Sequence, residues 1–345
     1  EEYPVLARQL VEMIDRWVVR ELELLQRLCA DWDEMHALFA PMDDPGLLSE
    51  IKEGAGDPHQ GGRSVCILTW SSGLRLVYKP RPLAIDVHFQ ELLAWLNDHD
   101  CQPAFRTARL LDKESYGWYE YFTASGCASQ EQVERFYQRA GGYLALLYTL
   151  DATDFHAENL IAAGEDPMFV DLESLFQPYA EKYEGTDTYG YELLTHSVRR
   201  VGLLPQRQWL NGDAANIDLS GLGAPSQGAS VSANSWSGLG TDNVQPIKEQ
   251  VELKLGDHRP TLQGEQVNTL EYVQHIVAGF TTVYRLLLQQ REELLHDILP
   301  RFAHDRIRVL FRPTNIYALL QSDSLHPDVL RDALDREWLF DRLWI

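Results

Sequence analysis

The stretch TDFHAENLIAAGEDPMFVDLES, residues 153–174, decides how the rest of the chain is interpreted. It contains two short apolar runs, residues 160–162 and 168–170, with polar residues beside both. Apolar runs of this length, with Gly between them, are typical of short buried strands. We therefore expect a small hairpin, with Asn159 just before its first strand and Asp171 just after its second.

The polar residues of this stretch have the spacing of a phosphoryl-transfer site. Transfer from ATP needs a carboxylate that orients the attacking hydroxyl, and oxygen ligands for magnesium. An Asp, an Asn five residues later and an Asp after a hairpin match the catalytic loop and metal-binding Asp of protein kinases. Asp154 would accept the hydroxyl proton, while Asn159 and Asp171 would hold the metal. Glu173, where the kinase motif has Gly, would add a second carboxylate. Taken alone, the same residues also suit caps and turns.

Two histidines extend this hypothesis. His156 lies two residues after Asp154 and would orient its carboxylate. Asp57 and His59 lie in the glycine-rich segment GAGDPHQGG, residues 54–62, where an ordinary kinase has no such pair. An imidazole can steer a phosphate or transfer a proton. The alternative is that Asp57 stabilises a turn and that His59 is a surface histidine.

The chain also carries a lysine where a kinase needs one. Two strand-like runs, residues 64–70 and 74–80, are separated by Ser-Ser-Gly and predict a hairpin. Lys79 ends the second run, and kinases hold a strand lysine against the ATP phosphates below a flexible loop. Glu91, in the next expected helix, is a candidate partner for this lysine. A lone strand lysine is usually solvated, but here the lysine, loop and acidic cluster occur in the order of a kinase.

Other segments define the expected architecture. Apolar residues at helical spacing predict helices over about residues 4–40, around 89–96, over 131–150 and over about 269–297. Residues 220–243 are rich in Gly, Ser and Asn, lack periodicity, and predict a long loop. A β-rich part followed by a helical part is the α+β class.

Residues 308–316 alternate like a strand until Pro313. On an extended strand Arg308 and Arg312 share a face, so two guanidinium groups could grip one phosphate, with Thr314 nearby. The alternative is a strand edge with two surface arginines.

Composition excludes several classes of protein. Lys and Arg number 30 against 52 Asp and Glu, a net charge of −22, which argues against a nucleic-acid surface. The four widely spaced cysteines point to a reducing compartment, buried free thiols and no structural zinc. No apolar run approaches the roughly 18 residues of a membrane span, and no signal peptide is visible. We expect a cytoplasmic protein and, from the amphipathic residues near its end, a piece of a longer chain.

Taken together, these motifs resemble the dehydratase domain of class II lanthipeptide synthetases, the LanM type. The stretches that carry the resemblance are GDPHQGGRSVCILTWSSGLRLVYKPRPLAID (56–86), FQELLAWLND (89–98), TDFHAENLIA (153–162) and FVDLESLFQP (169–178). Weaker matches are the Gly/Ser-rich stretch ending at Asp242, EYVQHIVAGFTTVY (271–284) and RVLFRPTNIY (308–317). The combination is far more specific than any part of it.

The resemblance implies a two-lobed, lipid-kinase-like fold with a small β-rich N-lobe and a larger helical C-lobe. The expected parts are an N-terminal helical segment (1–50), an N-lobe with the glycine-rich loop and lysine strand (51–130) and a C-lobe with the catalytic and metal motifs (131–345). Such enzymes use ATP and Mg²⁺ to phosphorylate Ser and Thr of a ribosomal precursor peptide, and then eliminate phosphate to give dehydroalanine or dehydrobutyrine. Their own C-terminal zinc cyclase domain, absent from this chain, adds cysteine thiols.

Individual residues acquire roles from the same resemblance. The phosphorylation positions are Lys79, Asp154, His156, Asn159, Asp171 and Glu173, the loop motif is Asp57 and His59, and the elimination positions are Arg308 and Thr314. Glu249 and Glu252 are candidates for a further glutamate of the family. Phe155 departs from the pattern, because Leu is common there.

Two other functions fit part of the pattern. A small-molecule kinase of the aminoglycoside or choline type shares the Asp, Asn and Asp spacing but gives no reason for Asp57, His59, Arg308 or Glu173. An inactive pseudokinase that serves as a binding module is disfavoured by retention of the catalytic residues. Turnover of ATP with and without a Ser/Thr-rich peptide separates these functions.

Overall fold

The computed structural model describes residues 2–56, 60–179, 193–206, 218–223, 230–238, 241–243, 245–252, 257–309 and 314–344. The chain divides into two compact units. The first comprises Glu1–Leu83, Ala108–Tyr121 and Val309–Ile345, and the second Ala84–Thr107 and Phe122–Arg308. Each unit takes segments from both sides of residue 130, so this division differs from the three consecutive parts expected from the sequence.

The first unit contains one long helix and a five-stranded antiparallel sheet. Helix α1 spans Pro4–Phe39, as predicted. The strand order is β1-β2-β3-β5-β4, with β1 Leu48–Lys52, β2 Cys66–Trp70, β3 Arg75–Lys79, β4 Leu110–Asp112 and β5 Gly117–Glu120. The predicted hairpin is confirmed as β2–β3, in which Cys66 pairs with Tyr78. A short 3-10 helix, Gln60–Gly62, precedes it.

Apolar residues of α1 and of the sheet form one core in this unit. Leu24, Leu28 and Met35 of α1 pack in the same buried cluster as Leu68 and Trp118 of the sheet. The indole N–H of Trp118 donates a hydrogen bond of 2.8 Å to the buried carboxylate of Asp31. A buried polar pair of this kind fixes the helix against the sheet, because an unpaired partner would be costly.

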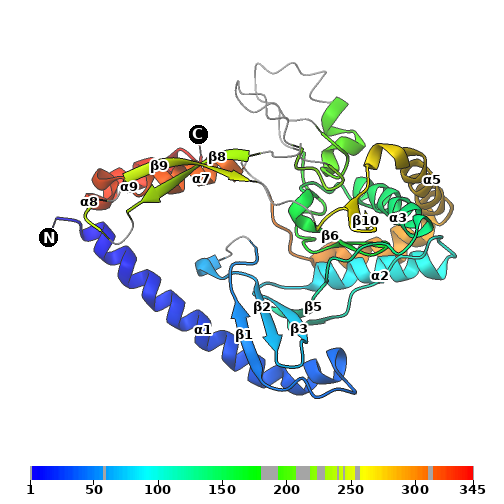
Figure 1. The fold of residues 1–345 in the computed structure, drawn as a ribbon, viewed down its shortest axis with the longest axis horizontal. Coiled ribbons are helices and arrows are strands. Elements are labelled where there is room, and N and C mark those ends of the chain that lie inside the picture. Colours follow the sequence, from blue (N-terminus) through cyan, green and yellow to red (C-terminus); the bar gives the residue numbers. More distant parts are fainter. Residues whose placement is uncertain are drawn as a thin grey trace. The chain divides into compact units, whose positions relative to one another are not determined.

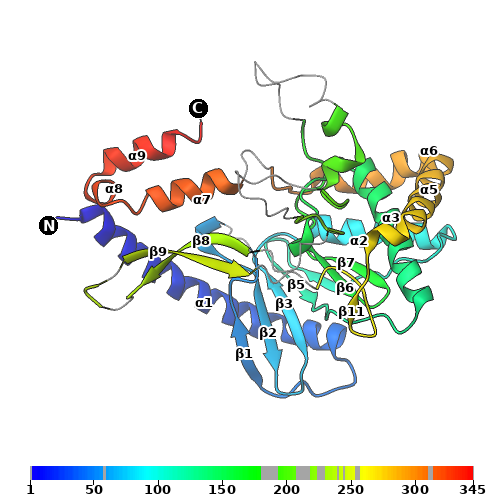
Figure 2. The same cartoon turned by 45° about the horizontal axis from the view of Figure 1, so that its top comes forward.

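The end of the chain is helical and belongs to the same unit. Helix α7 spans Thr314–Asp323, α8 Pro327–Arg331 and α9 Ala333–Asp341. They lie beside the start of α1, where Arg331 pairs with Glu2 and its guanidinium lies over the Tyr3 ring (Figures 1 and 2). The strand predicted for 308–316 is wrong from Thr314 on, where a helix begins, and residues 310–313 lie outside the described residues. In α7, Ile316 and the buried Leu320 are four residues apart and therefore lie on one face of the helix.

The second unit is built around three helices. Helix α2 spans Ala84–Asp98, α3 Gln130–Thr149 and α5 Val273–Gln289, each close to its predicted range. Helices α3 and α5 cross closely at two glycines. A Cβ atom on Gly279 would lie 1.8 Å from the Gln138 carbonyl oxygen, and one on Gly141 would lie 2.0 Å from that of Ile276. Only glycine permits this approach.

The helix predicted up to residue 297 continues after α5 in shorter pieces. A 3-10 helix, Thr269–Tyr272, precedes α5, and α6 (Arg291–Glu293), a π-helical turn (Leu294–Ile298) and a 3-10 helix (Leu299–His304) follow it. A further 3-10 helix covers Val198–Val201.

The described residues of the second unit also form three two-stranded pairs. They are β6 (Leu160–Ala163) with β7 (Asp166–Phe169), β8 (Ser230–Ser237) with β9 (Gln245–Glu252) and β10 (Thr261–Leu262) with β11 (Glu265–Gln266). The first is the hairpin predicted from the opening stretch. The second corrects the loop predicted over 220–243, since eight residues from 230 pair with β9. Backbone pairing needs no apolar side chains, so a Ser-rich strand gives little signal in sequence.

Three of the cysteines are buried thiols, as expected, but Cys29 is exposed. Burial raises the pKa of Cys66 to about 12 and that of Cys101 to about 11. Thiols that hold their protons so strongly are poor nucleophiles. Among the described residues, no helix is both long and apolar enough to cross a bilayer.

Candidate active site

The β6–β7 hairpin brings the two predicted magnesium ligands to the same end. Leu160 pairs with Phe169, and one residue further the Val170 N–H donates to the Asn159 carbonyl oxygen at 3.1 Å. Asn159 and Asp171 therefore leave the open end of the hairpin side by side. Backbone pairing alone brings these two residues, which are 12 positions apart in sequence, to the same end of the hairpin.

A second backbone ladder aligns the segment that contains Asp154 with the segment that follows Asp171. The Thr153 N–H donates to the Ser174 carbonyl at 3.1 Å. Phe176 and Gln177 donate in the same way to the carbonyls of Leu150 and Asp151. The predicted base and the predicted metal motif thus belong to neighbouring backbone segments of one unit.

Asp154 has an unusual backbone conformation. Its φ is 69°, in the left-handed region that few residues other than Gly adopt, although Asp tolerates it better than most. The side-chain amide of Asn159 donates a 2.9 Å hydrogen bond to the Asp154 carbonyl oxygen and stabilises this turn. Strained residues of this kind gather at functional sites, where the surrounding structure holds them.

His156 is turned toward Asp154. Its Nδ1 accepts a hydrogen bond from the Glu158 N–H at 3.3 Å, so a neutral ring carries its proton on Nε2. That Nε2 lies 3.6 Å from an oxygen of the Asp154 carboxylate. It also lies 3.5 Å from the Asn159 amide nitrogen, which is itself a donor and already donates to the Asp154 carbonyl oxygen. We therefore assign the imidazole N–H to the Asp154 side, which is what an orienting residue requires.

Phe155, the departure from the usual Leu, anchors the loop between these two residues. Its ring is fully buried and meets the ring of Phe169 edge-on, with centroids 5.1 Å apart. Its N–H donates to the Val201 carbonyl at 3.0 Å, and the Ala157 N–H donates to that of Leu219 at 2.9 Å. With Phe155 pointing inward, the Asp154 and His156 side chains remain partly exposed.

Arg308 joins the metal motif through its backbone. Its N–H donates to the Glu173 carbonyl at 2.9 Å, and its carbonyl accepts from the Gln177 side-chain amide at 2.6 Å. The Asp171 carboxylate accepts from the Glu173 N–H at 3.1 Å in the same segment. The structure thus places a residue assigned to elimination beside one assigned to magnesium, although 135 positions separate them in sequence.

Gln177 is the residue of this site that the sequence reasoning missed. It is buried, its side chain holds Arg308, and its N–H holds the segment before Asp154. The only signal was its place within the family-like stretch 169–178.

The other predicted residues belong to other segments of the chain. Lys79 is at the end of β3 in the first unit, 4% exposed, with its ammonium 4.3 Å from the centroid of the Tyr119 ring. Glu91 pairs with Arg301 at 2.6 Å. Thr314 is the first residue of α7, and Glu249 and Glu252 lie on β9. Arg308 and Thr314 thus do not share a strand. Asp57, His59 and Arg312 lie outside the described residues.

The donors at the open end of the hairpin suit magnesium by their chemistry. Two carboxylates, Asp171 and Glu173, and the amide of Asn159 offer the hard oxygen atoms that Mg²⁺ prefers, and this ion usually keeps several waters. The Asn159 amide uses its nitrogen for Asp154, so its oxygen is the end that can face a cation. No cluster of three or more His, Cys, Asp or Glu suited to a metal occurs within the part of the chain that the structure describes.

Comparison with known proteins identifies the class. Residues 3–345 match a family described as a domain of unknown function, DUF4135, and the chain belongs to this family. It is 26% identical over 366 residues to the lacticin 481/lactococcin biosynthesis protein LcnDR2 of Lactococcus lactis subsp. lactis. The alignment covers 99% of this chain and 38% of that protein. The predicted resemblance to class II lanthipeptide synthetases is confirmed by these two similarities.

Proposed function

We propose that this chain is the dehydratase part of a lanthipeptide synthetase with a kinase-like, two-lobed fold. It phosphorylates Ser and Thr hydroxyls of a ribosomal precursor peptide with ATP and then eliminates the phosphate. The observation that carries this proposal is the convergence of the Asp154 loop, the Asn159–Asp171 hairpin end and the Arg308 backbone within one unit. The similarity to a lacticin 481/lactococcin biosynthesis protein supports the peptide as substrate.

The first half-reaction forms an O–P bond on the peptide and breaks the bond between the γ-phosphoryl group and ADP. The carboxylate of Asp154 accepts the proton of the attacking hydroxyl. His156 orients that carboxylate, from which its Nε2 lies 3.6 Å away. Lys79 of the first unit is assigned to the ATP phosphates, in the role of the strand lysine of kinases.

Magnesium, when bound, neutralises charge that develops on the phosphate oxygens. Asn159, Asp171 and Glu173 are the residues that would hold it. The hydrogen bond from the Glu173 N–H fixes one oxygen of Asp171, so the rotamer of this carboxylate is set before any ligand arrives. A site that is prepared in this way loses less free energy to ordering when its ligand binds.

The second half-reaction removes a proton from the peptide α-carbon and breaks the Cβ–O bond, so that phosphate leaves and an alkene remains. Phosphorylation makes this possible, because phosphate is a far better leaving group than hydroxide. A guanidinium stabilises departing phosphate well, since it donates two parallel hydrogen bonds. We assign this task to Arg308 and, by the same family resemblance, a role in elimination to Thr314. Addition of cysteine thiols to the alkene belongs to the cyclase domain expected elsewhere in the longer protein, and ATP use and buried thiols suit the cytoplasm.

The experiment compares substrates with the full-length protein. ADP release is measured with a Ser/Thr-rich precursor peptide, with the same peptide carrying Ala in place of every Ser and Thr, and with an aminoglycoside or choline. We expect stimulation by the first peptide alone. Stimulation by a small alcohol and none by peptide would replace this proposal with a small-molecule kinase, and no turnover with any substrate would favour a pseudokinase.

A further inference from the structure

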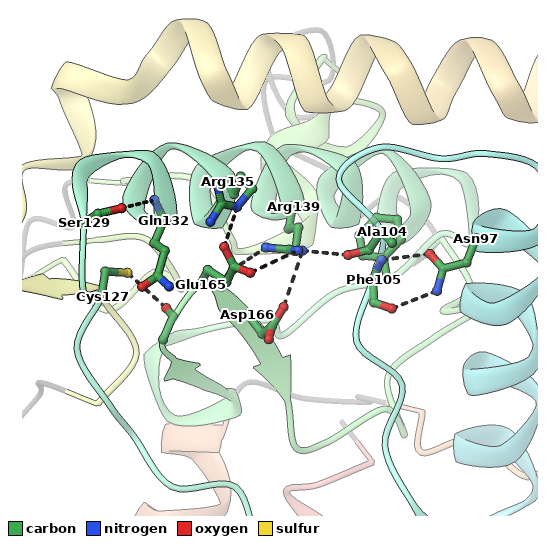
Figure 3. Close-up of polar contacts among 11 residues, drawn as sticks. Asn97, Ala104, Phe105, Cys127, Ser129, Gln132, Arg135, Arg139, Glu165 and Asp166 are labelled. Carbon is green, nitrogen blue, oxygen red and sulfur yellow. Dashed lines mark hydrogen bonds and ion pairs between the residues drawn. The ribbon is translucent and has the colours of Figure 1, made fainter.

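The turn of the β6–β7 hairpin, the end remote from Asn159 and Asp171, is held by a buried arginine of α3 (Figure 3). Arg139 is 8% exposed. Its Nε donates to the Ala104 carbonyl at 2.7 Å, and one terminal nitrogen donates to the Glu165 carbonyl at 3.0 Å. Its guanidinium also lies 3.4 Å from the Asp166 carboxylate and 3.7 Å from that of Glu165. One side chain thus contacts Glu165 of the turn and Asp166, the first residue of β7.

Further contacts hold the same turn from the other side. The Gly164 N–H donates to the Ser125 carbonyl at 3.0 Å, and the Cys127 thiol donates to the Gly164 carbonyl at 3.3 Å. Arg135, one helical turn before Arg139, bonds the Glu165 carboxylate at 2.5 Å but is 40% exposed (Figure 3). Arg135 makes none of the backbone contacts that Arg139 makes among these residues.

Arg139 supplies positive charge that stabilises the carboxylates of Glu165 and Asp166 at the turn. Burial raises the pKa of Asp166 above its usual value, and the Arg139 guanidinium opposes that shift. Without the Arg139 guanidinium, the half-buried carboxylate of Asp166 would lie beside Glu165 and would lack the main positive charge that stabilises it. Removing one partner of a buried ion pair strongly destabilises the local structure. The turn would then shift or take up a proton.

Helix α3 touches the hairpin at two levels. Arg139 holds the turn, and Tyr143, four residues later and on the same helical face, meets Phe169 near the open end with ring centroids 4.9 Å apart. A two-stranded hairpin this short is only marginally stable by itself. Four residues of strand separate the turn from the open end by about 13 Å. If the turn is released while the aromatic contact remains, the hairpin can pivot about Phe169.

We propose that Arg139 is a positioning residue that sets the placement of Asn159 and Asp171 by clamping the far end of their hairpin. It touches neither substrate nor metal. The inference rests on the proposed function, because it assumes that these two residues bind the ion. Misplacing a ligand by about 1 Å can cost on the order of 100-fold in activity, so a small pivot is sufficient.

The test measures ion binding without turnover. Mn²⁺ binding to the full-length protein, in the presence of a non-hydrolysable ATP analogue, is followed by electron paramagnetic resonance. We expect Arg139→Met to weaken Mn²⁺ binding about tenfold, the lower end of what loss of an orienting partner costs a metal site. Arg139→Lys should recover part of this loss. Arg135→Met, the matched control on the same helix face, should leave binding within about twofold of the parent, because its ion pair is exposed.

The outcomes separate a positioning role from a structural one. If Arg139→Met lowers the melting temperature but binds Mn²⁺ as the parent does, the clamp is structural and the proposal is wrong. If Arg139→Met does not fold, Arg139→Lys and Glu165→Gln carry the test, and normal Mn²⁺ binding by both would overturn it. The proposed function fails separately, and the clamp with it, if Asp171→Asn binds Mn²⁺ as tightly as the parent.

Discussion

The segment over residues 150–177 and the segment over residues 305–317 differ in how their backbones are held. In the first, two backbone ladders and a buried Phe155 fix the Asp154 loop to the residues around Asp171. In the second, Arg308 is held at Glu173 in one unit, while Thr314 begins a helix of the other. The transfer residues of this segment are therefore preorganised together, although Lys79, also assigned to transfer, belongs to the other unit. The two residues assigned to elimination belong to separate units.

This difference suggests that the two half-reactions respond differently to substitution. Transfer should fail sharply when one residue of the first segment is changed, because its neighbours are locked in place and cannot compensate. Elimination should be lost more selectively, through residues that the transfer step does not need.

The largest effect is expected at the first segment. Asp171→Asn and Asp154→Ala should each abolish detectable phosphorylation, because losing a principal charge-stabilising contact raises the barrier by about 3–4 kcal/mol. Phosphopeptide formation and thermal unfolding are measured together. Both side chains are partly exposed, so we expect cooperative unfolding to persist. Near-normal transfer by either folded variant would remove the kinase assignment.

Lys79→Met should reduce ATP turnover by roughly 100-fold, the size of effect seen on removal of one charged or polar donor to a transition state. The lysine is almost fully buried over Tyr119, and Met keeps its length and apolar stem. Circular dichroism melting serves as the control. A variant that is unfolded at the assay temperature would show instead that Lys79 supports the sheet.

Arg308→Ala tests whether the second segment serves elimination and not phosphate transfer. Two of its hydrogen bonds are made by the backbone, which alanine keeps, and we expect the variant to fold and to transfer phosphate. Loss of a charged hydrogen-bond donor should slow elimination at least about tenfold. Mass spectrometry should then show accumulated phosphopeptide where the parent gives dehydrated peptide.

Thr314→Ala should show the same accumulation, and Arg312→Ala a smaller one. Equal loss of both steps in Arg308→Ala would mean that this residue supports the fold or ATP binding, and the elimination assignment would fall.

The smallest effect concerns stability at low pH. Burial lowers the pKa of His258 below its usual value, and the ring donates to the Gly223 carbonyl at 3.1 Å. The unfolded chain binds a proton at His258 below about pH 6.5, whereas the folded chain resists it. This residue therefore lowers the free energy of unfolding as the pH falls through that value.

His258→Gln keeps an N–H donor and should make unfolding by urea less dependent on pH between about 7 and 5.5. His296→Gln, at a histidine that is 75% exposed, is the matched control and should leave the dependence unchanged. An identical slope in His258→Gln and the parent would contradict the burial of a neutral imidazole.

The two segments also show what the sequence could and could not predict. The β6–β7 hairpin and the lysine strand were predicted because each depends on local patterns, short apolar runs closed by turn residues. The stretch from Arg308 was predicted as a strand, but residues 305–309 form no strand and Thr314 begins a helix. Alternation over so few residues does not distinguish a strand from irregular backbone.

Contacts between distant segments could not be predicted from the sequence pattern. Gln177 reaches Arg308 across 131 positions, and Arg139 reaches the carbonyls of Ala104 and Glu165. Nothing in the local sequence of either residue distinguishes it from an ordinary polar residue. Pairing of the Ser-rich β8 with β9 was missed for a related reason, since the backbone supplies the bonds.

The central claim is tested most directly by following one precursor peptide over time with ATP, magnesium and the full-length protein. Intact-mass spectrometry should show a phosphorylated species that forms first and then decays into a product that has lost one water at each modified Ser or Thr. Asp171→Asn should give neither species. Dehydrated peptide that appears without ATP, or that forms normally in Asp171→Asn, would contradict the account.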